Sequence, residues 1–276
     1  MKNVRAKKSL GQHFLNDEHI ASRIADTISA RELPEHARPW GDLPILEIGP
    51  GMGILTKYLM DTGRQLECVE LDSESVGFLH NLYPSLNVVE ADFLKMDLDT
   101  VFPGQDMALI GNFPYNISSQ IFFKVLDYRD RIPVAAGMLQ KEVAERICAA
   151  PGNRDRGILS VLLQAWYDCE YLFTVEPYVF TPPPKVRSGV LRLTRNDRTD
   201  LGCDPADFKK VVKQAFSMRR KTLRNSLAPL LAAIPAAIAA AIAADTLAPI
   251  EPLLTERPER LSVDQFVLLT NLLIQK

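Results

Sequence analysis

The chain has 276 residues, of which 47% are hydrophobic, and a net charge of −2. This length is enough for one sizeable core and a smaller second domain. The near-neutral charge excludes a protein that binds nucleic acid through a global basic excess, so any such binding must be local. The cysteines form no Cys-x-x-Cys pair, which favours free thiols in a reducing cytoplasm and disfavours a zinc or other metal site; they are Cys68, Cys148, Cys169 and Cys203.

The chain begins with a basic arm and continues with alternating short apolar runs and helical patterns. Residues 1–10 lack the apolar stretch of a signal peptide. Strands are expected at residues 45–48, 66–71, 87–90, 108–111 and 134–139, with helices between them at 53–60, 74–82, 118–127 and 141–149. Such alternation predicts βαβ units and a mostly parallel sheet. Two later runs, 170–175 and 189–193, are candidates to close that sheet antiparallel.

A change in composition after Thr194 predicts a domain boundary near residue 195. Residues 1–195 would form an α/β domain, and residues 196–276 would form a smaller helical domain with helices at 205–216, 219–231, 235–244 and 262–274. Ser262 is the expected N-cap of the last helix, with Gln265 at the capping-box position. The apolar stretch 227–244 is rich in alanine and contains Pro229 and Pro235, so we interpret it as buried helices and expect no membrane partner.

Basic residues gather in two acid-free stretches. The first is at the N-terminus, and the second lies in the C-terminal domain; the residues are Lys2, Arg5, Lys7, Lys8, Lys213, Arg219, Arg220, Lys221 and Arg224. Local clusters of this kind can contact phosphates on a near-neutral protein. A solvated helix face remains the simpler interpretation of any single run.

A glycine loop follows the first expected strand and opens a helix. Gly49, Gly51 and Gly53 would allow a tight turn and a close approach of a ligand to the backbone. The third glycine of a dinucleotide-binding loop is replaced by Ile54, and no Walker lysine follows, so a phosphate cradle is disfavoured. The loop favours a nucleoside cofactor, although a plain strand-to-helix turn would also explain it.

Acidic residues end the next two strands. Glu70 lies about 20 residues beyond the loop, where a ribose is expected in such sheets. Asp92 ends the following strand and could accept a hydrogen bond from the amino group of the cofactor adenine, with Phe93 beside it. The carboxyl ends of parallel strands meet at one sheet edge, so we expect these acids to face the glycine loop.

The tetrad Asn112-Phe113-Pro114-Tyr115 follows the fourth strand at that same edge. Adenine N6 is a weak nucleophile because its lone pair is delocalised into the ring. Asn112 Oδ1 and a carbonyl of Phe113 or Pro114 could accept both N–H groups and localise that lone pair, in a geometry fixed in advance by the proline. Tyr115 could stack on the base. The tetrad therefore predicts methyl transfer to an adenine amino group, with an ordinary proline turn as the alternative.

Phe180 precedes the stiff segment Pro182-Pro183-Pro184. It could stack on the other face of a base that has left its helical stack. A core phenylalanine before a rigid turn is an equally good interpretation.

With these residues in view, the chain resembles the KsgA-type (RsmA) small-subunit ribosomal RNA adenine dimethyltransferases almost from end to end. The segments that carry the resemblance are 8–17 (KSLGQHFLND), 46–51 (LEIGPG), 111–119 (GNFPYNISS), 139–146 (LQKEVAER), 180–186 (FTPPPKV), 215–224 (AFSMRRKTLR) and 261–263 (LSV). The combination is much more specific than a glycine loop alone.

The resemblance implies a Rossmann-like methyltransferase domain with S-adenosylmethionine as methyl donor. It implies dimethylation at N6 of two adjacent adenosines in the 3′-terminal hairpin of 16S rRNA, in the 30S subunit, and a role in 30S biogenesis. It implies cofactor contacts from His13 and Leu15, beside Gly49, Glu70, Asp92 and Asn112. Spacing alone would make residues 11–15 a connector. We expect RNA contacts from Lys7, Lys8, Arg219, Arg220, Lys221 and Arg224, and a cytoplasmic monomer.

Phe113 stands where the family usually has leucine, and residues 232–244 match poorly. Two other functions remain open at this stage. One is methylation of large-subunit RNA by a relative that confers macrolide resistance, and the other is a ribosome-assembly factor without catalysis.

Overall fold

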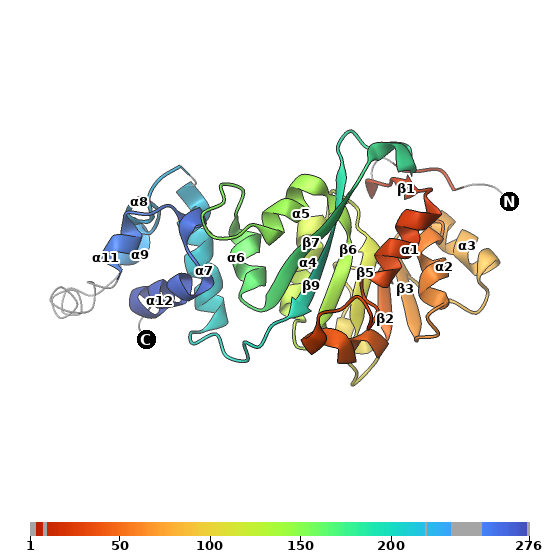
Figure 1. The fold of residues 1–276 in the computed structure, drawn as a ribbon, viewed down its shortest axis with the longest axis horizontal. Helices are drawn as coiled ribbons and strands as arrows, with labels where there is room; N and C mark the ends of the chain where they lie inside the picture. The colour runs from red at the N-terminus through yellow and green to blue at the C-terminus, as the bar shows by residue number, and fades with distance from the viewer. Residues whose placement is uncertain (1–3, 8–9, 219, 233–249, 275–276) are drawn as a thin grey trace. The chain divides into compact units, whose positions relative to one another are not determined.

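The structure is a computed structural model that describes residues 4–7, 10–218, 220–232 and 250–274 (Figure 1). The expected helix at 235–244 and the basic residues Lys2, Lys8 and Arg219 lie outside the described residues. The chain divides into two compact units. The first comprises Met1–Glu145 with Tyr167–Arg195, and the second comprises Arg146–Trp166 with Asn196–Lys276.

Within its described residues, the first unit contains a seven-stranded sheet in the order β4-β3-β2-β5-β6-β9-β7. The strands are β2 (Ile45–Ile48), β3 (Leu66–Glu70), β4 (Asn87–Glu90), β5 (Ala108–Asn112), β6 (Val134–Gln140), β7 (Tyr167–Val175) and β9 (Ser188–Arg195). The strands from β4 to β6 pair in parallel, whereas β9 is antiparallel to both β6 and β7. The predicted mostly parallel seven-stranded sheet is confirmed.

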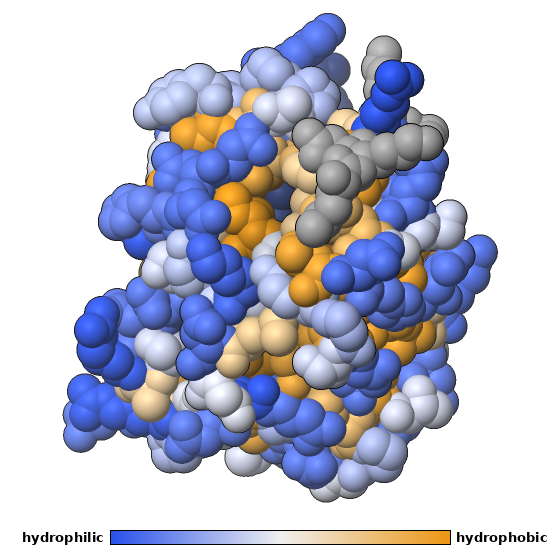
Figure 2. Space-filling view, turned by 90° about the vertical axis from the view of Figure 1, so that its right-hand side faces the viewer, coloured by the Kyte–Doolittle hydropathy of each residue, from blue (hydrophilic) through white to orange (hydrophobic). Residues whose placement is uncertain are grey.

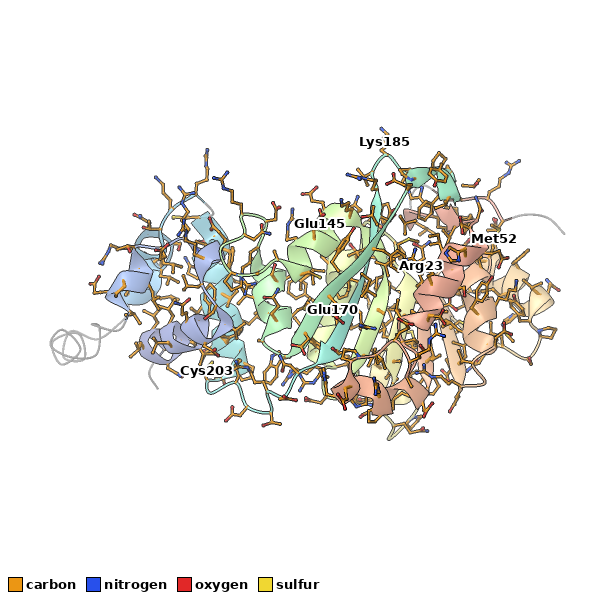
Figure 3. The ribbon with its side chains drawn as sticks, in the orientation of Figure 1. Arg23, Met52, Glu145, Glu170, Lys185 and Cys203 are labelled. Atoms are coloured by element: carbon orange, nitrogen blue, oxygen red, sulfur yellow. The ribbon has the colours of Figure 1, made fainter. Side chains whose placement is uncertain are left out.

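Helices alternate with these strands and cover the sheet. They are α1 (Glu18–Asp26), η2 (Glu35–Asp42), α2 (Ile54–Met60), α3 (Ser73–Leu82), η3 (Leu98–Thr100), α4 (Ser118–Asp127), α5 (Lys141–Cys148) and η4 (Pro177–Val179). Helix α1 was not predicted from the sequence. It begins after Asp17, whose carboxylate accepts a hydrogen bond from Ile20 N, and it buries Ile24 in the core with Leu59 of α2. The guanidinium of Arg23 lies 3.8 Å from the centre of the Phe173 ring of β7 (Figure 3).

A second, two-stranded sheet joins the N-terminal segment to a distant part of the first unit. Strand β1 (Phe14–Leu15) pairs antiparallel with β8 (Phe180–Thr181), so that Leu15 faces Phe180. Asn16 N donates to the Val179 carbonyl over 2.8 Å. The segment that looked like a connector is therefore tied to the chain just before β9 (Figure 1).

The described part of the second unit is helical, as predicted. Its elements are α6 (Ile158–Gln164), α7 (Pro205–Ala215), η5 (Phe216–Met218), α8 (Leu223–Ser226), α9 (Ala228–Ala232), α11 (Glu251–Leu254), η6 (Pro258–Arg260) and α12 (Val263–Leu273). Ser262 caps α12 in a capping box with Gln265, as expected. The helix predicted at 219–231 is instead divided into α8 and α9, because Pro229 has no N–H for a continuous helical ladder.

The division of the chain into domains at residues 1–195 and 196–276 remains a prediction, because compact units need not be separate domains. The compact units differ from it by one segment, because residues 146–166 group with the C-terminal residues. The physical reason is that α6 packs against α7 and α12. No pattern of hydrophobic residues in the sequence indicates that residues 146–166 would pack with the C-terminal helices.

Phe113, the unusual residue of the tetrad, anchors the end of β5 in the core. Its side chain is 1% exposed, and its ring meets Phe122 of α4 edge-on with 5.7 Å between centroids. The ring also lies over Gly111 and Gly137 on neighbouring strands. The space left by these glycines explains how the larger ring fits into the core.

We expect Gly137→Ala to destabilise the protein. Its new Cβ would lie 2.5 Å from the Gly111 carbonyl oxygen and 2.6 Å from Phe113 Cε2. Overpacking of this kind lowers the free energy of unfolding by about 1–3 kcal/mol, which a urea titration measures. Gly77→Ala is the matched control, because Gly77 lies in α3 and an added Cβ meets nothing within 4 Å. Alanine favours a helix, so this control should gain stability by about 1 kcal/mol; similar changes in both variants would contradict the packing argument.

Candidate active site

A cavity of about 200 Å³ lies where β2, β3, β4 and β5 end. Its walls are residues 10–15, the loop after β2, and the chain that follows each of the other three strands. The structure brings together nine of the residues predicted for the site: His13, Leu15, Gly49, Gly51, Glu70, Asp92, Asn112, Pro114 and Tyr115. Figure 2 shows this end of the molecule hollowed between hydrophobic side chains, and Figure 3 labels Met52 on the wall that follows β2.

The glycine loop depends on left-handed backbone conformations. Gly49, Gly51 and Gly53 have φ angles of 65°, 57° and 81°. A Cβ on Gly51 would also lie 3.0 Å from Phe14 Cε1, so this glycine lets the N-terminal segment approach the loop. The loop therefore exposes its backbone to the cavity and supports β1 at the same time.

Glu70 holds the glycine loop in place from the end of β3. Oε2 accepts a hydrogen bond from Gly51 N over 3.1 Å, and Oε1 accepts from Leu71 N and Asp72 N over 2.8 and 2.9 Å. Burial raises the pKa of this carboxyl, while the three backbone donors act in the opposite direction. A carboxylate has about four acceptor sites, so Glu70 keeps capacity for a ligand hydroxyl.

Glu47 is a second buried acid of the cavity wall, and sequence reasoning gave it no role. It is 1% exposed at the centre of β2 and accepts a weak hydrogen bond from Cys68 Sγ over 3.5 Å. Burial raises its pKa to about 7. An acid inside an otherwise apolar strand, just before a glycine loop, is the signal that could have drawn attention to it.

Asp92 shapes the turn that follows β4. Its Oδ1 accepts from Leu94 N over 3.0 Å, and Oδ2 lies 3.4 Å from the ammonium of Lys95. Phe93 is buried next to it, as expected for packing. The acid at the cavity wall is thus also the residue that closes the turn.

Asn112 is oriented by the N-terminal segment. Its Nδ2 donates to the His13 carbonyl over 3.1 Å, which leaves Oδ1 as the acceptor of the amide. His13 in turn has its Nδ1 2.7 Å from the Pro182 carbonyl oxygen. The side chain that the tetrad argument needs is therefore fixed by contacts that no local motif encodes.

Tyr115 is fixed at both ends of its side chain. Its hydroxyl lies 2.5 Å from Ser188 Oγ, and its ring lies 5.4 Å from the His13 ring, tilted by 31°. Burial raises the pKa of the Tyr115 phenol, so it stays protonated near neutral pH. Ser188, which is fully buried at the start of β9, was not found from the sequence, because its contact spans 73 residues.

The structure does not bring Phe180 to this cavity. Its side chain is 3% exposed and belongs to the hydrophobic core, where it faces Leu15 across the β1–β8 pair. This placement agrees with the second interpretation of Phe180, a core phenylalanine before a rigid turn. A stacking role would require the ring to leave the core.

The basic residues predicted to bind RNA differ in whether they are already ion-paired within the protein. Lys7 forms an ion pair with the buried Asp72, and Gln12 Nε2 lies 3.4 Å from the same carboxylate. In the second unit, Arg220 and Lys221 are exposed. Arg224, also exposed, is ion-paired with Glu251. Lys7 therefore holds the N-terminal segment on the first unit, a role that sequence analysis did not anticipate.

Two further observations concern the described residues only. They contain no group of three or more His, Cys, Asp or Glu side chains arranged to hold a metal ion. No helix in the described ranges is long and apolar enough to cross a membrane.

Comparison with known proteins identifies the family. The profile of the ribosomal RNA adenine dimethylase family matches residues 3–248. The chain belongs to this family. Family membership confirms the predicted enzyme class, a methyltransferase that dimethylates adenine in ribosomal RNA.

Individual relatives align with nearly the whole chain at high sequence identity. A ribosomal RNA small subunit methyltransferase A from Parabacteroides distasonis is 56% identical, covering 98% of this chain and 94% of that protein. Its counterpart from Porphyromonas gingivalis is 54% identical over the full length of both.

Solved structures agree with the fold. A dimethyladenosine transferase from Plasmodium falciparum has a TM-score of 0.73 at 25% identity, covering 93% of this chain and 96% of that one. The 23S rRNA methyltransferase ErmE has a TM-score of 0.61 at 28% identity, covering 94% of this chain and 99% of that one.

The raised pKa of Glu47 predicts a pH-dependent stability. Its folded pKa of about 7 exceeds its usual value of 4.5, so the folded state keeps the proton that the unfolded state loses between these values. Stability is therefore lost as pH rises through this window, by up to about 3 kcal/mol. Glu47→Gln should gain stability over the wild type by that amount between pH 5 and 8.

Urea titrations of the two proteins at a series of pH values provide the test. Glu90→Gln, which neutralises an exposed carboxylate at the end of β4, is the control for a changed net charge. Parallel pH profiles for wild type and Glu47→Gln would show that Glu47 is not the titrating group.

Proposed function

We propose that this protein transfers methyl groups from S-adenosylmethionine to N6 of two adjacent adenosines in the 3′-terminal hairpin of 16S rRNA. The observation that carries this proposal is the orientation of the Asn112 amide. Its Nδ2 donates to the His13 carbonyl, so Oδ1 remains to accept a hydrogen bond from an exocyclic amine. The small ribosomal subunit is favoured over the large one because the relatives named for the small subunit share 50–56% identity, against 28% for the 23S enzyme.

The residues of the cavity fit a nucleoside methyl donor. S-adenosylmethionine, when bound, supplies an electrophilic methyl group on a sulfonium. The remaining acceptor capacity of Glu70 suits a ribose hydroxyl, and Asp92 suits an adenine amino group. Gly49 and Gly51 allow close approach to the backbone. We assign His13 and Leu15 to the cofactor side, since both line the same cavity.

Asn112 and its neighbours would prepare the acceptor amine. Asn112 Oδ1 and one backbone carbonyl accept its two N–H groups, which localises the nitrogen lone pair toward the methyl donor. The Pro114 carbonyl already accepts from Ile117 N over 3.2 Å, so the Phe113 carbonyl is the stronger candidate for the second acceptor. No strong base is required, because the methylated cationic amine is acidic enough to lose its proton afterwards.

Tyr115 would form the stacking surface for the target base. The Ser188 hydroxyl and the His13 ring restrict the plane of the tyrosine before RNA arrives. Phe180 supports this arrangement from the core through its pairing with Leu15. Orientation of the two reactants therefore supplies most of the catalysis.

The RNA partner would be held by basic residues, of which Arg220, Lys221 and Arg224 are exposed. We assign Arg220, Lys221 and Arg224 to phosphate contacts, together with Lys8 and Arg219, which lie outside the described residues. Lys7 would contribute only after releasing Asp72. With a ribosomal subunit as substrate, we propose a cytoplasmic enzyme that acts as a monomer and participates in 30S biogenesis.

Asn112→Ala should abolish methyl transfer, because the acceptor of the amine is removed, and should leave cofactor affinity within about threefold, because the contacts assigned to Glu70 and Asp92 remain although the bond to the His13 carbonyl is lost. Transfer of labelled methyl groups to unmethylated 30S subunits measures the first quantity, and calorimetry with S-adenosylhomocysteine measures the second. Asn81→Ala, which removes an exposed amide of α3, is the control and should be fully active. Normal turnover by Asn112→Ala would refute the role of the tetrad.

The double variant Arg220→Ala/Lys221→Ala should weaken RNA binding and make it less dependent on salt. Loss of two phosphate contacts reduces the slope of log affinity against log salt concentration by about two. Arg31→Ala/Lys95→Ala removes the same charge from exposed positions of the first unit and serves as control. An unchanged slope in the first variant would remove these residues from the RNA-binding surface.

A further inference from the structure

Lys124 is a buried lysine for which the proposed chemistry has no use. It lies in α4, is 8% exposed, and its ammonium donates to the Phe93 carbonyl over 2.6 Å and to the Met96 carbonyl. The ammonium also lies 5.0 Å from the centre of the Phe93 ring. Lysine is rarely buried to this extent unless its charge is compensated.

Backbone dipoles and the aromatic ring compensate this charge at close range. The carboxylates of Asp92, Asp97 and Asp127 favour the ammonium only through longer-range attraction, and burial lowers the pKa of Lys124 despite them. Burial of this ammonium is energetically unfavourable, and its direct partners are two backbone carbonyls. We therefore expect a structural role of Lys124 in the segment that carries these carbonyls.

Both carbonyls belong to the turn that carries Asp92. In this turn, Lys95 N and Met96 N donate to the Asp92 carbonyl over 2.9 and 3.2 Å. Asp92, Phe93 and Leu94 also line the cavity. The ammonium therefore fixes the second and the last residue of a five-residue turn whose first residue is the acid of the cavity wall.

The helix that supplies Lys124 begins beside the catalytic tetrad. Ile117, which precedes α4, donates from its backbone N to the Pro114 carbonyl over 3.2 Å. One rigid helix thus contacts the acceptor side of the cavity at its start and the cofactor side through Lys124.

We propose that Lys124 is a positioning residue that sets the place of Asp92 and thereby the preference of the cavity for adenine in the cofactor. This inference rests on the proposed function, in which Asp92 accepts from the adenine amino group. The ammonium does not touch the cofactor. It holds the turn, so that the Asp92 carboxylate meets a base carrying an amino group and not one carrying a carbonyl.

The test compares two ligands, S-adenosylhomocysteine and S-inosylhomocysteine, which differ at the base: adenine has an amino group at C6, whereas hypoxanthine has a carbonyl at C6 and a proton on N1. Calorimetry on the wild type should show a preference for the adenosyl ligand. Lys124→Met, which keeps the length and apolar stem of the side chain, should reduce this preference about tenfold, as expected for one charged hydrogen bond. Lys210→Met makes the same change at an exposed lysine of α7, which does not line the cavity, and should keep the preference.

The ratio of the two affinities separates positioning from general destabilisation, which would weaken both ligands alike. An unchanged ratio in folded Lys124→Met would overturn the role of Lys124 and leave the proposed function intact. If the wild type itself binds neither ligand or both equally, the assignment of Asp92 fails, and this inference fails with it. Should Lys124→Met not fold, Lys124→Gln replaces the ammonium with a shorter, neutral amide, and an unchanged ratio there would also overturn the proposal.

Discussion

The parallel register of β4, β3, β2 and β5 is the constraint on which the site depends. Because these strands end at one edge, the glycine loop, Glu70, Asp92 and Asn112 meet although they are spread over more than 60 positions of the chain. The hydrogen bond from Gly51 N to Glu70 then joins two of these strand ends directly. The sheet therefore sets the order of the functional groups, and hydrogen bonds between the loops fix their final positions.

The N-terminal segment completes the cavity on the other side. It is held by the β1–β8 pair, by the ion pair of Lys7 with Asp72, and by the bond from Asn112 to the His13 carbonyl. The same segment that would contact the cofactor therefore also orients the amide that prepares the acceptor. This shared dependence gives a physical reason for the cofactor and acceptor sides of the cavity to be built together, since residues 12–15 line the cavity and the His13 carbonyl accepts from Asn112.

Sequence reasoning recovered the sheet, the glycine loop, the acids at the strand ends and the tetrad, because each is encoded by local periodicity or by a short motif. It missed helices α1 and α6 and strands β1 and β8, and its domain boundary near residue 195 differs from the compact units by residues 146–166. These depend on contacts between distant segments, as the pairing of Leu15 with Phe180 shows. Ser188 and Lys124 were missed for the same reason, since the role of each is set by a partner remote in sequence. Glu47 was missed although an acid inside an apolar strand is a local signal. Phe180 was placed at the cavity wall because its motif does not reveal which way the ring points.

The identity of the methylated nucleotide decides whether this enzyme acts on the small ribosomal subunit. The wild-type protein would be incubated with labelled S-adenosylmethionine and either unmethylated 30S subunits or 50S subunits, and the RNA would be analysed as nucleosides after fragment mapping. We expect N6,N6-dimethyladenosine at two adjacent positions of the 3′-terminal hairpin of 16S rRNA and no label in the 50S sample. Label in 23S rRNA, or no label in either RNA despite measurable cofactor binding, would contradict this expectation.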